Sequence, residues 1–121
     1  MRDESLYSRL QAGLRDALKA RDAGTVKALR SALAAIANAE AVDASPTAPA
    51  SRGPFAGAVD GLGSAEATRR ALTEADIREI VATEVADRRA AALQYDSLDQ
   101  RDAAADLREQ AQTLENYLER T

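Results

Sequence analysis

The chain has 121 residues, which suits one domain and leaves no room for a second domain of ordinary size. Hydrophobic residues make up 45% and charged residues 30%, whereas aromatic residues make up only 3%, so we expect a thin, aliphatic core. The absence of cysteine and histidine excludes disulfides, thiolate nucleophiles, zinc-finger ligands and the usual general base.

The net charge of −4 is unevenly distributed along the chain. Residues 1–42 hold 7 basic and 5 acidic residues, whereas residues 73–121 hold 6 basic and 12 acidic ones. Opposite signs favour docking of the two halves, and the acidic total weighs against nucleic acid unless the positive charges of the first half share one side. No apolar run approaches about 18 residues, and the N-terminus is too acidic for a signal peptide. We therefore expect a cytoplasmic protein with no membrane partner.

A leucine at every fourth position predicts an amphipathic helix over residues 4–21. The leucines of its apolar stripe are Leu6, Leu10, Leu14 and Leu18. A second helix is predicted over residues 25–41, and its many alanines allow a partner helix to approach closely. Between the two, Gly24 can adopt a positive φ, and Thr25 or Asp22 can accept hydrogen bonds from the free N–H groups of the second helix. A connection this short makes the two helices antiparallel.

Residues 43–63 hold all three prolines and four of the six glycines, which predicts a long loop. Loops of about 20 residues are uncommon in compact domains, so this one is expected to be either functional or disordered. Phe55, the only phenylalanine, lies inside it. This side chain either pins the loop onto the helices or is an exposed anchor for a partner, unless its segment is disordered. Residues 65–71 can form a short helix.

A third helix, predicted over residues 73–95, carries the clearest start signal. Thr73 is the expected N-cap, Asp76 completes a capping box, and Leu72 can meet Ile77 as a hydrophobic staple. The expected buried face consists of Ile77, Ile80, Val81, Val85, Ala92 and Tyr95. Two i,i+4 ion pairs are expected on the solvent side, namely Glu74–Arg78 and Glu84–Arg88.

A fourth helix is predicted over residues 99–119, with Asp99 as its N-cap and Asp102 at its third position. Its heptad seam consists of Leu107, Ala111, Leu114 and Leu118. The four helices pair as two antiparallel hairpins, and no alternating stretch predicts a strand. The expected fold is therefore all-α, with the long loop between the second and third helices.

No constellation of residues predicts catalysis, because the serines have no histidine to activate them. Asp102, Asp106 and Glu109 share one helix face, which we interpret as a solvated stripe and not as a metal site. No phosphate-binding loop motif occurs, and no cofactor is expected. The candidate contacts for an anion or RNA are Lys27, Arg30, Arg88 and Arg89. For the arginine pair, a solvated helix edge is the competing interpretation.

Residues 20–41 and residues 72–118, taken together, resemble the GatB/YqeY-related family. Residues 20–41, ARDAGTVKALRSALAAIANAEA, are similar to its early helix pair, in which a charged turn leads into a T-L-R…A-I-x-N-x-E helix. Residues 72–118 resemble a pattern that begins with L-T-D/E and ends with L-x-x-Y-L. The residues that match this second pattern are Thr73, Arg88, Arg89, Tyr95, Asp102, Ala104, Leu114, Tyr117 and Leu118.

The resemblance implies an all-helical protein related to the tail of the tRNA-dependent amidotransferase B subunit, a region associated with tRNA. Stand-alone members have no established activity. Family members commonly continue past the Tyr117–Leu118 position into a second helical domain linked to tRNA, so this sequence is expected to be a short form without that tail. We therefore expect a non-enzymatic module associated with tRNA or a translation-related protein. The alternative is a protein-interaction or self-association module with no nucleic-acid role.

Overall fold

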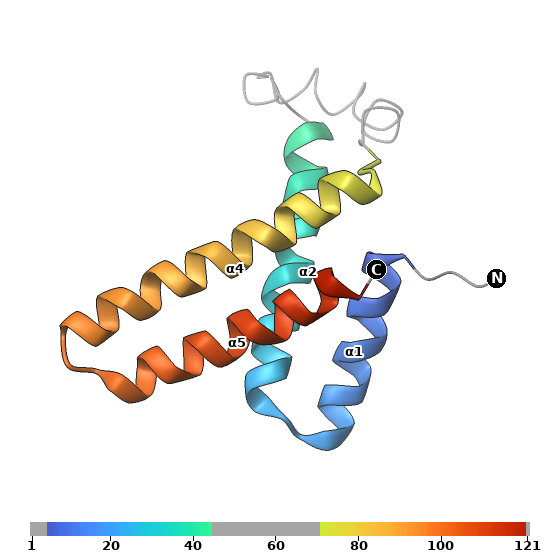
Figure 1. Ribbon diagram of the computed structural model, residues 1–121. Coiled ribbons are helices and arrows are strands. Elements are labelled where there is room, and N and C mark those ends of the chain that lie inside the picture. Colours follow the sequence, from blue (N-terminus) through green and yellow to red (C-terminus); the bar gives the residue numbers. More distant parts are fainter. Residues whose placement is uncertain (1–4, 45–70, 121) are drawn as a thin grey trace, which may run out of the picture.

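The computed structural model describes residues 5–44 and 71–120, and within these ranges it contains four helices and no strand (Figure 1). The helices are α1 (Leu6–Ala20), α2 (Ala23–Ala44), α4 (Glu74–Ser97) and α5 (Arg101–Glu119). Short connections join α1 to α2 and α4 to α5, so each pair forms an antiparallel hairpin, and α2 crosses the α4–α5 pair (Figure 1). The predicted all-α fold of two helical hairpins is confirmed.

The core shared by all four helices lies where the hairpins cross. Its largest fully buried side chains are Leu6, Leu10, Leu29, Ile36, Val81 and Leu114. Ala28, Ala32 and Ala111 are also completely buried in this cluster. Because alanine adds only a methyl group at each contact, α2 can lie close to its partners. The buried residues of this cluster are all aliphatic, as the composition predicts.

The turn between α1 and α2 differs from the prediction. The residue with a positive φ is Arg21, at 57°, whereas Gly24 lies inside α2 without one. Asp22 caps α2 as predicted, since its Oδ1 accepts a hydrogen bond from the Thr25 N–H at 3.2 Å. Capping by Asp22 lets α2 begin at Ala23, and the helix continues to Ala44, inside the predicted loop, because its alanine-rich sequence favours helix up to that point.

The start of α4 follows the sequence signal. Thr73 Oγ1 accepts from the Asp76 N–H and Asp76 Oδ2 accepts from the Thr73 N–H, both at 3.0 Å. Leu72 packs against the same core cluster that contains Ile77. The capping box is therefore confirmed, and both members of the predicted staple lie against one core.

The start of α5 does not follow the sequence signal. Asp99 lies in the turn with a φ of 63°, and Gln100 is the N-cap, without a side-chain hydrogen bond. The prediction that Asp99 caps this helix is wrong. Aspartate tolerates the left-handed region better than most residues, so the tight α4–α5 turn uses Asp99 for its backbone conformation instead.

Two residues predicted for the core lie at the surface. Leu18 in the last turn of α1 is 46% exposed, and Tyr95 near the end of α4 is 38% exposed. The apolar spacing of each helix continues to these positions, but no other helix of the described residues covers them fully there. Phe55 and the predicted short helix, except Ala71, lie outside the described residues, as does the predicted loop after Ala44. Ala71 itself precedes α4 and is not helical.

Candidate interaction surfaces

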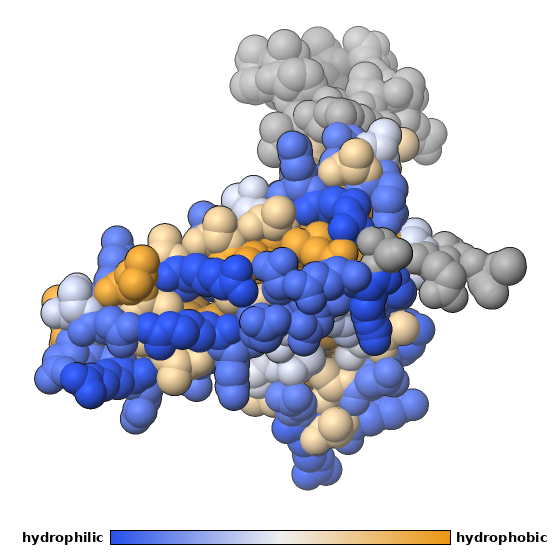
Figure 2. All heavy atoms as spheres, in the orientation of Figure 1, coloured by the Kyte–Doolittle hydropathy of each residue, from blue (hydrophilic) through white to orange (hydrophobic). Residues whose placement is uncertain are grey.

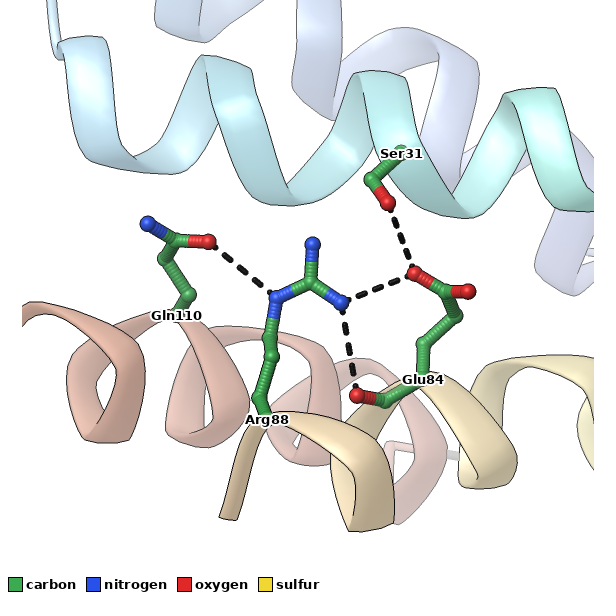
Figure 3. Close-up of polar contacts among 4 residues, drawn as sticks. All are labelled: Ser31, Glu84, Arg88 and Gln110. Atoms are coloured by element: carbon green, nitrogen blue, oxygen red, sulfur yellow. Dashed lines mark hydrogen bonds and ion pairs between the residues drawn. The ribbon is translucent and has the colours of Figure 1, made fainter. Parts of the chain in front are cut away.

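Four polar side chains from three helices meet where α2 crosses the α4–α5 hairpin (Figure 3). Glu84 Oε1 accepts from Ser31 Oγ at 2.7 Å and from Arg88 Nη1 at 2.8 Å. Arg88 Nε donates to Gln110 Oε1 at 3.1 Å. The side chains of Arg88 and Glu84 are only 13% and 18% exposed, and Gln110 is buried. This polar cluster links the two hairpins inside the molecule.

The Glu84–Arg88 ion pair exists as predicted, but its predicted place on the solvent side is wrong. Both residues lie on the face of α4 toward α2, where a carboxylate and a guanidinium are costly to desolvate unless each is paired and hydrogen-bonded. The pairing within the cluster meets this condition. Sequence reasoning missed Ser31 and Gln110. The available signal was that Gln110 directly precedes the heptad residue Ala111, at the edge of the apolar seam.

The four predicted anion contacts do not form one exposed cationic surface. Lys27 and Arg30 are exposed on α2, whereas Arg88 is mostly buried in the polar cluster. Arg89 pairs with Glu115 of α5 at 3.3 Å, with about half of its side chain exposed. Of these four predicted contacts, only Lys27 and Arg30 are therefore exposed cations without an ion pair to another described residue. An anion or RNA contact through them stays a prediction.

Glu74 joins the starts of two helices. Its Oε2 accepts from the backbone N–H of Leu6 at 3.1 Å, and its Oε1 accepts from the same group at 3.4 Å. Leu6 is the first residue of α1, whose early N–H groups have no partner within the helix, and a carboxylate there also complements the helix dipole. The predicted pairing of Glu74 with Arg78 is replaced by this contact.

Two arginines bind the last turn of α5 from neighbouring helices. Arg9 Nη1 of α1 donates to the Tyr117 carbonyl at 3.1 Å, and Arg78 Nη2 of α4 donates to the Leu118 carbonyl at 2.7 Å. The final carbonyls of a helix lack helical partners and carry partial negative charge, so cationic donors stabilise them. These two contacts join α1 and α4 to the end of α5.

A polar hollow of about 350 Å³ lies between the start of α2 and the middle of α5. Its lining includes the side chains of Asp22, Thr25, Glu109 and Gln110. None of the described residues that line it is basic. The hollow therefore does not favour a phosphate or another anion.

The free end of the α4–α5 hairpin projects beyond α2 and carries apolar residues at its surface (Figures 1 and 2). The core shared by the four helices includes no residue of α4 after Val85 and none of α5 before Ala111. Beyond these positions Ala92 and Ala104 are still buried, because α4 and α5 pack against each other. Leu98, in the turn, is 66% exposed.

On the side of the hairpin that faces α2, this free end presents an apolar surface that we name the tip stripe. The tip stripe consists of Ala91, Tyr95, Leu98, Ala103 and Leu107. The residues from α4 and the turn follow Arg88, which points toward α2, at steps of three, four and three residues (Figure 3). Those from α5 precede Gln110 at steps of three and four. Such steps keep residues on one helix face. The tip stripe is therefore the continuation of the α2-facing surface of the hairpin, beyond the point where α2 covers it.

Comparisons of the chain with protein-family models, curated proteins and solved structures find no match. Across residues 5–44 and 71–120, no helix is both long and apolar enough to cross a membrane. The same residues contain no group of three or more aspartates or glutamates that could hold a metal ion.

Proposed function

We propose that this chain is a non-enzymatic helical module that binds a protein partner through the tip stripe. The observation that carries the proposal is the exposure of Tyr95 and Leu98, at 38% and 66%, on a surface whose continuation under α2 is buried. Clustered apolar residues at the surface of a small protein mark interaction sites more often than singly scattered ones do. The resemblance to the GatB/YqeY-related family is compatible with this role, and a cytoplasmic location is part of the proposal.

A non-enzymatic role agrees with how the buried polar groups are used. Glu84, Arg88 and Gln110 hydrogen-bond to one another and to α2 between packed helices. These contacts hold the two hairpins together. The missing histidine and cysteine point in the same direction.

Position-specific photo-cross-linking tests the proposal. A photoreactive benzoylphenylalanine is placed at position 98, in the tip stripe, or at position 18 on α1, where Leu18 is also exposed. We expect the chain with benzoylphenylalanine at position 98 to give a cross-linked product of discrete size with a partner protein. The chain with benzoylphenylalanine at position 18 should give no such product. Adding Tyr95→Asp should remove that product. Equal products from both positions, or no product from position 98, would contradict the proposal.

A second candidate function is association with tRNA, which the exposed Lys27 and Arg30 on α2 favour together with the family resemblance. Contacts of this kind depend on salt, because each neutralised phosphate releases counterions. We expect a salt-dependent mobility shift of bulk tRNA at micromolar protein, weakened by Lys27→Gln with Arg30→Gln. The absence of binding at about 50 mM salt, where electrostatic contacts are strongest, would exclude this function.

A further inference from the structure

Carboxylates border the tip stripe on both sides. Asp87 lies one turn before Ala91 on α4, and Asp106 lies beside Leu107 on α5. Both aspartates are exposed, and neither pairs with another of the described residues. The neighbouring arginines are engaged elsewhere, in the pairs Arg89–Glu115, Arg101–Asp99 and Arg108–Asp96. The border of the apolar surface is therefore left with uncompensated negative charge.

From this arrangement we propose that the tip stripe binds a short amphipathic helix with basic residues on both sides of its apolar face. The inference rests on the proposed function and names the chemistry of the partner. Two helices that lie side by side and expose an apolar face toward a missing neighbour form the groove that an amphipathic helix fills. Lysine or arginine at its borders would face Asp87 and Asp106.

The size of the tip stripe limits the partner and its affinity. Ala91 and Leu98 are seven residues apart, which corresponds to about 10 Å, or two helical turns. The partner therefore needs apolar residues at positions i, i+3 or i+4, and i+7. An interface this small is typical of transient complexes, so we expect dissociation constants of about 1–100 μM.

A second copy of this chain suits the tip stripe less well. Two copies related by twofold symmetry would bring the same surface together. Asp87 and Asp106 of one copy would then border the same two aspartates of the other, and like charges across an interface disfavour association. The charge pattern selects a partner of opposite sign.

Two synthetic helical peptides and the full 121-residue chain test the inference. The peptides share one leucine face and differ only in their borders, which are lysine in one and glutamate in the other. In NMR titrations we expect the lysine peptide to shift the amide signals of Ala91, Tyr95 and Leu107, with an affinity that falls as salt rises. The glutamate peptide should bind at least about tenfold more weakly, because its charges repel the aspartates.

Substitutions locate the binding. Asp87→Asn combined with Asp106→Asn should weaken the lysine peptide by about three- to tenfold, because two exposed charge contacts are lost. Leu98→Ser should weaken both peptides without changing the melting temperature, because Leu98 is 66% exposed and outside the core. Glu79→Gln is the matched control, since Glu79 is exposed on α4 but away from the tip stripe.

Three results of the peptide titrations would overturn the inference. They are equal binding of both peptides, binding that maps to α1 and α2, and no binding of either peptide. A dimer in sedimentation equilibrium that Leu98→Ser dissociates would show that a second copy occupies the tip stripe, which overturns the basic-helix partner but keeps a protein-binding function. The proposed function is judged separately by the cross-links from position 98.

Discussion

Gly13 of α1 makes room for the side chain of Tyr117 of α5. A Cβ atom at position 13 would overlap the Tyr117 hydroxyl, and it would lie 2.9 Å from Tyr117 Cζ and 3.3 Å from Leu29 Cδ1. The Tyr117 carbonyl meanwhile accepts a hydrogen bond from Arg9, one turn earlier on α1. The absence of a side chain at position 13 therefore lets α1 and α5 approach closely.

Gly13→Ala should lower the free energy of unfolding by about 1–3 kcal/mol, because the new methyl group overpacks the contact with Tyr117. A decrease in the free energy of unfolding would be informative, because alanine in a helix interior is otherwise favoured over glycine by about 1 kcal/mol. Urea denaturation measures the change. Gly24→Ala is the control, because the nearest atom to a Cβ there is Asp22 Oδ1 at 4.0 Å. Equal stability of the two variants would show that the Gly13–Tyr117 contact is not tight.

Tyr117 should make the protein less stable at alkaline pH. Burial raises the pKa of its hydroxyl above 10.0. The positive charges of Arg120 and Arg9 lower this pKa and the negative charge of Asp16 raises it, but burial has the largest effect. The unfolded chain therefore loses this proton first, so the free energy of unfolding is unaffected well below pH 10.0 and falls as pH rises through 10.0 toward the folded-state pKa.

Urea denaturation of wild type and Tyr117→Phe at a series of pH values measures this contribution. Phenylalanine cannot ionise, so its stability should fall less steeply in the alkaline range than that of the wild type. Tyr7→Phe, which changes an exposed tyrosine of α1, controls for the general effect of high pH. Parallel curves for wild type and Tyr117→Phe would show that Tyr117 ionises equally in both states.

The fold was predictable because its signals are local. The four-residue leucine spacing predicts the helix α1, and the capping box of Thr73 and Asp76 predicts the start of α4. Each signal lies within one helix and both elements agree with the structure, although Leu18 at the end of the leucine spacing is exposed. Asp99 failed as a predicted cap because aspartate also suits a left-handed turn. Tyr95 failed as a predicted core residue because spacing identifies a helix face but not how far another helix covers it.

The interaction surfaces were less predictable because they depend on contacts between distant segments. The sequence predicts Arg88 as a solvent-facing partner of Glu84 and as a candidate anion contact. Only the fold brings Ser31, 53 residues before Glu84, against the Glu84 carboxylate. Likewise, Leu98 is exposed because it lies beyond the part of the hairpin against which α2 packs. Neither relationship is encoded within one helix. The periodicity of the sequence therefore could not distinguish charged side chains that hold the fold together from those that are exposed to a partner.

Replacing Arg88 should be far more costly than replacing its neighbour Arg89. Arg88→Met leaves the largely buried Glu84 carboxylate with only Ser31 as a donor and removes the partner of Gln110, so we expect a loss of about 1–3 kcal/mol. Arg89→Met breaks an exposed ion pair and should cost less than about 1 kcal/mol. Urea denaturation compares the two.

A second substitution identifies the cause of the Arg88 effect. Adding Glu84→Gln to Arg88→Met removes the unpaired charge, so the double variant should be more stable than Arg88→Met alone. An additive loss would instead indicate that the two residues contribute independently. Equal stabilities of Arg88→Met and Arg89→Met would contradict the buried polar cluster itself.

Glu74→Ala should loosen the start of α1, although the substitution lies on α4. The Leu6 N–H loses its carboxylate acceptor, while Ser5 still accepts from the Ser8 N–H, so we expect a loss of about 1 kcal/mol and faster hydrogen exchange of Leu6. Glu79→Ala removes an exposed carboxylate from the same helix and should leave that exchange unchanged. If exchange in α1 is the same in both variants, Glu74 does not cap α1 in solution, and any loss of stability would arise from the dipole of α4 alone.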